Sequence, residues 1–113
     1  MFCKKWATLV VIIVAILLSA CSEKLPSNAS SLLNTELKLK NYEILSYQKA
    51  PYPENYPSYY GEADEVWCIV IDNKDSIVGV YGVIAHRVGN LWTTRSPSLK
   101  RNFEQVGCEN TDW

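Results

Sequence analysis

The chain has 113 residues, with 11 Lys and Arg against 12 Asp and Glu and a formal net charge of −1. A chain of this length builds one small domain, which excludes multi-domain enzymes and large dinucleotide-binding or barrel folds. Its basic residues form no cluster or stripe of the kind that neutralises phosphates, so nucleic-acid binding is not expected.

The first residues form a short basic start followed by an apolar run. Lys4 and Lys5 precede an unbroken apolar run at residues 9–18. This run is too short to span a bilayer as a permanent helix, and the combination is typical of a secretory signal. The last residue of the run and the three that follow it, Leu18-Ser19-Ala20-Cys21, resemble the lipobox of bacterial lipoproteins.

The lipobox resemblance implies cleavage before Cys21 and covalent lipidation of that cysteine, which would anchor the chain to a membrane. The residue after the cysteine is Ser22 rather than Asp, which implies sorting to an outer membrane, facing the periplasm. The alternatives are an ordinary signal that leaves a plain thiol, or an uncleaved N-terminal helix. Residues 1–20 are therefore expected to be a signal peptide, 21–31 a flexible polar tether, and 32–113 a single domain.

The expected domain begins with a short helix at residues 31–40, although Leu37 and Leu39 also fit strand alternation. Apolar and β-branched runs then predict strands at residues 42–47, 66–71, 77–88 and 91–94. The run at 66–71 is apolar throughout, which indicates a central strand that is buried on both faces. Gly89-Asn90 is a strong hairpin signal between the last two strands, and Pro97 is expected to end the fourth.

The C-terminal residues favour a second helix. Leu99, Phe103 and Val106 recur at i, i+4 and i+7, which places one apolar stripe on a helix, and Gly107 is suited to terminate it. The resulting fold class is α+β: a small antiparallel sheet of about four strands in a meander, with an N-terminal short helix and a C-terminal helix packed on it.

Two cysteines fall within the expected domain. Cys68 lies in the expected central strand and Cys108 lies just after the second helix. Two thiols in an oxidising compartment are expected to pair, and the bond would join this helix to the sheet. A metal pair or a catalytic thiol is the weaker alternative, because there is no Cys-x-x-Cys motif and the chain holds a single histidine.

Candidates for catalysis are few. His86, the single histidine, is expected on the face of Ile84 as a surface or partly buried side chain, with no nucleophile in an elbow-like context beside it. Glu62, Asp64 and Glu65 cluster before the central strand, where a solvated strand entry is the simpler interpretation. No phosphate loop, dinucleotide fingerprint or calcium loop is present. The sequence therefore predicts no enzyme, no cofactor and no metal site.

Residues 50–61 hold three of the five prolines and four of the seven tyrosines. Prolines stiffen a segment, and tyrosine offers a large flat contact surface with a hydroxyl group. Such loops are common at recognition surfaces, so Tyr52, Tyr56, Tyr59 and Tyr60 are candidates for binding a partner protein or stacking on a glycan. The alternative is a long connection whose rings fold back to extend the core.

These observations predict a lipid-anchored cell-envelope protein of binding or structural type, with a non-catalytic accessory or adaptor role. An inhibitor of a lysozyme-type enzyme is one alternative, by analogy with small exported lipoproteins of similar size. A module that binds peptidoglycan or another glycan through the tyrosine-rich loop is the other.

Overall fold

The computed structural model describes residues 23–113. The expected signal peptide, the lipobox and Cys21 lie outside the described residues. Within residues 23–113, no helix is both long and apolar enough to cross a membrane.

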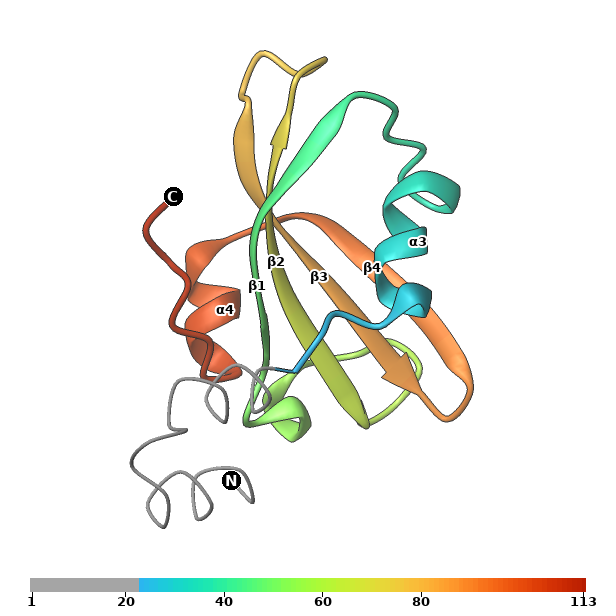
Figure 1. Ribbon diagram of the computed structural model, residues 1–113. Coiled ribbons are helices and arrows are strands. Elements are labelled where there is room, and N and C mark those ends of the chain that lie inside the picture. Colours follow the sequence, from blue (N-terminus) through green and yellow to red (C-terminus); the bar gives the residue numbers. More distant parts are fainter. Residues whose placement is uncertain (1–22) are drawn as a thin grey trace, which may run out of the picture.

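The fold is a four-stranded antiparallel sheet with one helix on each face (Figure 1). The strands follow one another in the order β1-β2-β3-β4, so the sheet is a simple meander. This confirms the predicted α+β class. The strands are β1 (Tyr42–Lys49), β2 (Glu65–Asn73), β3 (Val80–Val88) and β4 (Leu91–Ser98).

The two central strands bury side chains on both faces, as the apolar run predicted for β2. One face of the sheet packs Trp67, Ile69, Ile71, Val83 and Ala85 against the N-terminal helix. The opposite face packs Val66, Cys68, Val70 and Ile84 against the C-terminal helix and the tyrosine-rich loop. The alternation of β2 therefore supplies two thin cores instead of one.

The N-terminal helix α3 spans Ser27–Thr35, which is earlier than the predicted 31–40. It begins directly after Pro26, whose carbonyl accepts hydrogen bonds from the backbone N–H groups of Ala29 and Ser30, both at 3.0 Å. Ala29, Leu32 and Leu33 form the buried stripe. Residues 27–31, expected to belong to the tether, are thus helical, because a buried alanine extends the stripe one turn toward the N-terminus.

The C-terminal helix α4 spans Lys100–Gln105, within one residue of the prediction at each end. Gly107 terminates it with a φ of +88°, a conformation that glycine adopts at little cost. The N–H of Cys108 donates to the carbonyl of Phe103 at 2.9 Å, and the N–H of Gly107 to that of Glu104 at 3.0 Å, which is the Schellman pattern. The predicted bond between Cys68 and Cys108 is present.

Two strand boundaries differ from the predictions by more than two residues. The third strand begins at Val80, not at residue 77, because Ile77 and Val78 lie at the tip of the β2–β3 turn, where Ile77 is fully exposed. The fourth strand continues through Pro97 to Ser98, and the pairing with β3 shifts register there. An edge strand tolerates proline at such an irregularity, because no ladder hydrogen bond is lost.

Candidate functional site

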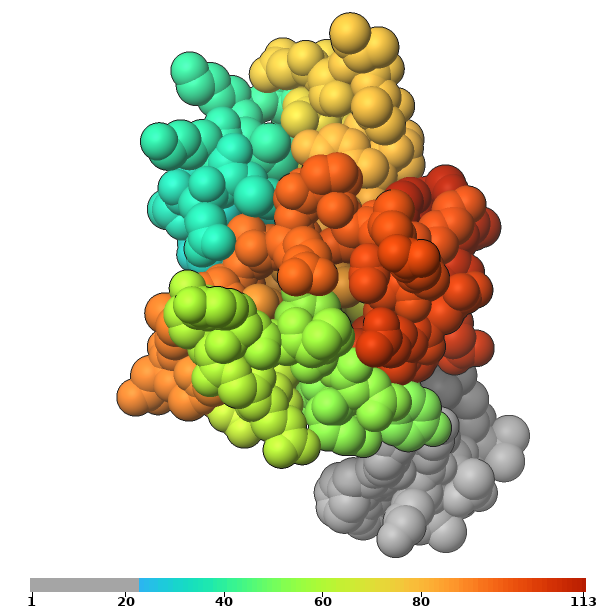
Figure 2. Space-filling model, turned by 180° about the vertical axis from the view of Figure 1, so that it is seen from behind, coloured from blue at the N-terminus to red at the C-terminus, as the bar shows by residue number. Residues whose placement is uncertain are grey.

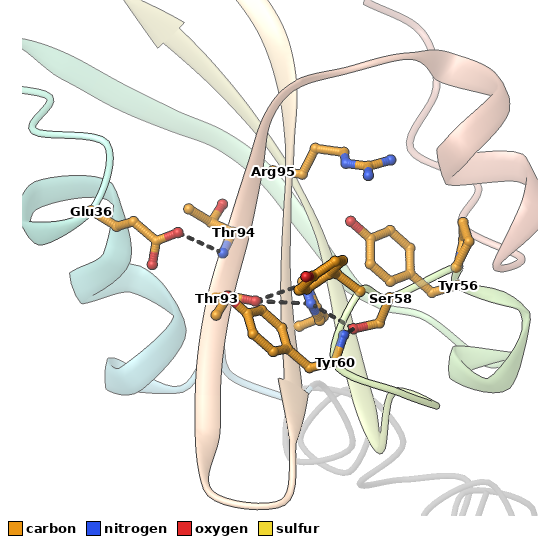
Figure 3. Close-up of a pocket in the computed structure, with 10 residues that line it drawn as sticks. Glu36, Tyr56, Ser58, Tyr60, Thr93, Thr94 and Arg95 are labelled. Carbon is orange, nitrogen blue, oxygen red and sulfur yellow. Dashed lines mark hydrogen bonds between the residues drawn. The ribbon is translucent and has the colours of Figure 1, made fainter.

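A cavity of about 190 Å³ opens where the tyrosine-rich loop meets the edge strand β4. Figure 2 shows this side of the molecule, with the loop in green below α3 in cyan and beside β4 in orange. The residues that line the cavity come from the residue that follows α3, from residues 56–60 of the loop, and from the facing parts of β3 and β4. Figure 3 shows their side chains.

The floor of the cavity is a buried aromatic pair. Tyr56 is 3% exposed and His86 is 6% exposed, and their ring centroids lie 4.7 Å apart. The Nε2 atom of His86 shares hydrogen bonds with the hydroxyl groups of Thr93, at 2.8 Å, and Ser58, at 3.3 Å. The strand alternation correctly placed His86 on the Ile84 face, but the side chain is buried there.

Burial shifts the pKa values of both rings in the direction that keeps them neutral. Desolvation lowers the pKa of His86, and the nearby Arg95 guanidinium lowers it further. Desolvation raises the pKa of Tyr56, against a smaller lowering effect of Arg95. Because the usual values are about 6.5 for His and 10 for Tyr, both side chains are uncharged at neutral pH.

The Ser58–His86 contact differs from a nucleophile–base pair in one respect. Thr93 lies closer to the same imidazole nitrogen than Ser58 does. The other ring nitrogen, Nδ1, lies 3.4 Å from the Thr93 hydroxyl, and no carboxylate among residues 23–113 contacts it. In a nucleophile–base pair a third group orients the base; at this site the group that contacts Nδ1 is the Thr93 hydroxyl.

The rim of the cavity carries two exposed tyrosines and a cation. Tyr59 is 93% exposed and Tyr60 is 55% exposed, with their rings edge to face at 5.3 Å. The backbone N–H of Tyr60 donates to the Ser58 hydroxyl at 3.2 Å, and the same hydroxyl contacts His86 in the floor. The Arg95 guanidinium lies over the Tyr56 ring, 5.9 Å from its centroid.

A carboxylate from the opposite layer completes the lining. Glu36 follows the last residue of α3, and its Oε1 accepts a hydrogen bond from the backbone N–H of Thr94 at 3.2 Å. That N–H belongs to the edge strand β4, as Figure 3 shows. The contact satisfies an edge donor that would otherwise be available for pairing with another strand.

The four candidate tyrosines of the loop do not lie together in the structure. Tyr59 and Tyr60 reach the cavity rim, whereas Tyr56 is part of the core. Tyr52 lies elsewhere: its N–H donates to the Val106 carbonyl at 3.0 Å, and its ring lies against Gly107. The loop therefore contributes to the core through Tyr56 and leaves Tyr59 and Tyr60 exposed, and binding through these two residues stays a prediction.

Two of the three acidic residues that cluster at the start of β2 hold this end of the strand in place. Glu65 accepts a hydrogen bond from the Trp67 indole at 2.7 Å and lies 3.4 Å from the Arg87 guanidinium. Asp64 accepts a hydrogen bond from the Gly89 N–H at 2.8 Å, at the β3–β4 turn. These contacts give Asp64 and Glu65 structural partners on β3 and its turn.

Sequence reasoning missed Thr93, Arg95 and Glu36 as cavity residues. A signal for Thr93 was present, since the two-residue turn at 89–90 sets the hairpin register and places residue 93 opposite His86. Arg95 follows two residues later on the same face of the strand. The approach of Glu36 has no sequence signal, because it depends on how α3 packs across the sheet.

Residues 23–113 contain no group of three or more His, Cys, Asp or Glu side chains placed to hold a metal ion. Comparison with known protein families, curated proteins and solved structures finds no match.

Proposed function

We propose that the protein is a lipid-anchored, non-catalytic binding protein of the bacterial cell envelope that recognises a glycan through the cavity beside β4. An accessory role in an envelope assembly is consistent with such binding. The anchor rests on the lipobox at Cys21, and the Cys68–Cys108 bond suits an exported, oxidising location.

The observation that carries the binding proposal is the pair of exposed rings at the rim of a polar cavity. Tyr59 and Tyr60 are too exposed to contribute much to the core. Exposed aromatic rings complement the C–H face of a sugar, because the ring face is weakly negative and the C–H hydrogens are weakly positive. The hydroxyl groups of Ser58 and Thr93 retain hydrogen-bonding capacity beyond their contacts with His86.

The size of the cavity suits a small ligand group. Its volume of about 190 Å³ is below the roughly 300–1,000 Å³ of sites that enclose a drug-sized ligand. One sugar ring or a terminal group of a longer chain therefore fits, while the remainder of the chain lies outside.

Co-sedimentation with insoluble peptidoglycan tests the binding function. The full chain in mild detergent is expected to sediment with the polymer, and a Tyr59→Ser/Tyr60→Ser variant is expected to stay in the supernatant. Tyr52→Ser is the matched control, because Tyr52 belongs to the same loop and is 53% exposed but lies away from the cavity. If the double variant sediments as well as the wild type, glycan recognition by this cavity is wrong.

Metabolic labelling with an alkyne analogue of palmitate tests the anchor. Labelling is expected in the wild type and in Cys3→Ser, and is expected to be lost in Cys21→Ser. Labelling that persists in Cys21→Ser would contradict the lipobox interpretation.

A further inference from the structure

We propose that the ligand of this cavity is an acidic saccharide, with its carboxylate on Arg95 and a sugar ring against the exposed tyrosines. The inference rests on the proposed glycan-binding function and adds the charge of the ligand. The inference follows from three observations. Arg95 has no ion-pair partner among residues 23–113, the two rings of the cavity floor are uncharged, and the Glu36 carboxylate also lines the cavity.

Arg95 is an exposed cation at the cavity that has no ion-pair partner in the described part of the chain. The ion pairs among residues 23–113 join Lys49, Lys74 and Arg87 to carboxylates, and none includes Arg95. Its guanidinium lies over the Tyr56 ring, and such stacking orients the planar group while leaving its N–H edges free. A free guanidinium edge is suited to a bidentate pair with a carboxylate.

The surroundings of Arg95 favour an anion over a neutral group. The imidazole and the phenol beneath it are uncharged at neutral pH, so neither competes for the guanidinium. Thr93 and Arg95 project from the same face of β4, at a spacing of roughly 7 Å for two residues. This spacing suits one sugar ring, with hydroxyl groups near Thr93 and a charged substituent at Arg95.

The second charge in the lining limits the ligand to few negative charges. Glu36 also lines the cavity, and its contact with the Thr94 N–H holds the carboxylate there. A polyanion with a charge on every unit would meet this carboxylate as well as Arg95. A saccharide with one isolated carboxylate avoids the repulsion.

A matched pair of disaccharides isolates the carboxylate. The β-1,4-linked disaccharide of N-acetylglucosamine and N-acetylmuramic acid differs from the disaccharide of two N-acetylglucosamine units by one lactyl ether, which carries the acid. Both are titrated into the full chain in mild detergent and followed by calorimetry. The wild type is expected to bind the acidic disaccharide about tenfold more tightly, as a charge-assisted hydrogen bond at a partly exposed site allows.

Arg95→Gln assigns the effect to the guanidinium. This variant is expected to bind both disaccharides with the affinity that the wild type has for the neutral one. Arg101→Gln is the matched control, because Arg101 is exposed on α4 and does not line the cavity. It is expected to keep the tenfold preference, and thermal unfolding checks that both variants fold.

Each result bears on a different statement. Equal wild-type affinity for the two disaccharides overturns the acidic ligand and leaves glycan binding standing. A tenfold preference that persists in Arg95→Gln overturns the assignment to this residue. Binding of neither disaccharide overturns the glycan function and the inference with it.

Discussion

Loss of the Cys68–Cys108 bond is expected to remove a large part of the stability of the domain. The two residues are 40 positions apart, and closing a loop of this length lowers the entropy of the unfolded chain by an amount worth about 4 kcal/mol at 25 °C. A domain of about 90 residues has a total free energy of unfolding of roughly 5–13 kcal/mol. The bond therefore accounts for about a third or more of it.

Urea unfolding of Cys68→Ala, Cys108→Ala and the double variant measures this contribution. Alanine is chosen because Cys68 is fully buried, and a serine hydroxyl there would add a desolvation cost. With a urea dependence of about 1.3 kcal/mol/M, the midpoint of unfolding is expected to fall by about 3 M. Either single substitution breaks the same bond, so the double variant is expected to lose little more than each single variant.

Additive losses would refute this reasoning, because they would mean that the two sulfurs act independently. Reductant provides the control without any substitution: the unfolding curve of the reduced wild type is expected to approach that of the double variant. A wild-type midpoint that does not change in reductant would also contradict the entropic argument.

Further substitutions at three sites, the tyrosine-rich loop, Gly82 and His86, test the fold and the cavity. Tyr56→Ser is expected to cost about 3 kcal/mol of stability, as the loss of a buried ring does, whereas Tyr59→Ser is expected to stay within about 0.5 kcal/mol; thermal unfolding compares the two. Gly82→Ala would place its Cβ 2.6 Å from Cζ2 of Trp113, and a cost of about 1–3 kcal/mol is expected from overpacking, which a Trp113→Ala background should reduce. The pKa of His86 is lowered in the folded state, so as pH falls the unfolded chain protonates this imidazole before the folded chain does. Protonation of His86 therefore lowers the free energy of unfolding below about pH 6.5 and has no effect on it well above that pH. The wild type is therefore expected to lose more melting temperature between pH 7.5 and pH 5 than His86→Gln, and equal losses would contradict the buried imidazole.

The sheet was predictable because its signals are local. The apolar run of β2 and the two-residue turn at Gly89-Asn90 each depend on neighbouring residues, and both predictions are confirmed. Gly107 likewise follows the helix that it was expected to end. Pairing of Cys68 with Cys108 was predictable by elimination, since the expected domain holds no other cysteine.

The cavity was less predictable because it depends on packing between distant segments. Glu36 reaches β4 from the other side of the sheet, and nothing in its neighbourhood in the sequence indicates that. Tyr56 and Tyr59 have similar surroundings in the sequence but opposite burial, since the direction of each ring is set by how the loop crosses the sheet. Pro97 was expected to end a strand, yet an edge position with a register shift accommodates it.

The exposed β2–β3 turn has a consequence for proteolysis. Ile77 is fully exposed and Val78 is 73% exposed, which are features of a loop tip that a protease reaches first. This tip lies inside the covalent ring that the Cys68–Cys108 bond closes. A single cut there opens the ring without releasing a fragment, so the clipped protein is expected to run as one species on a gel and to separate into two pieces once reductant is added.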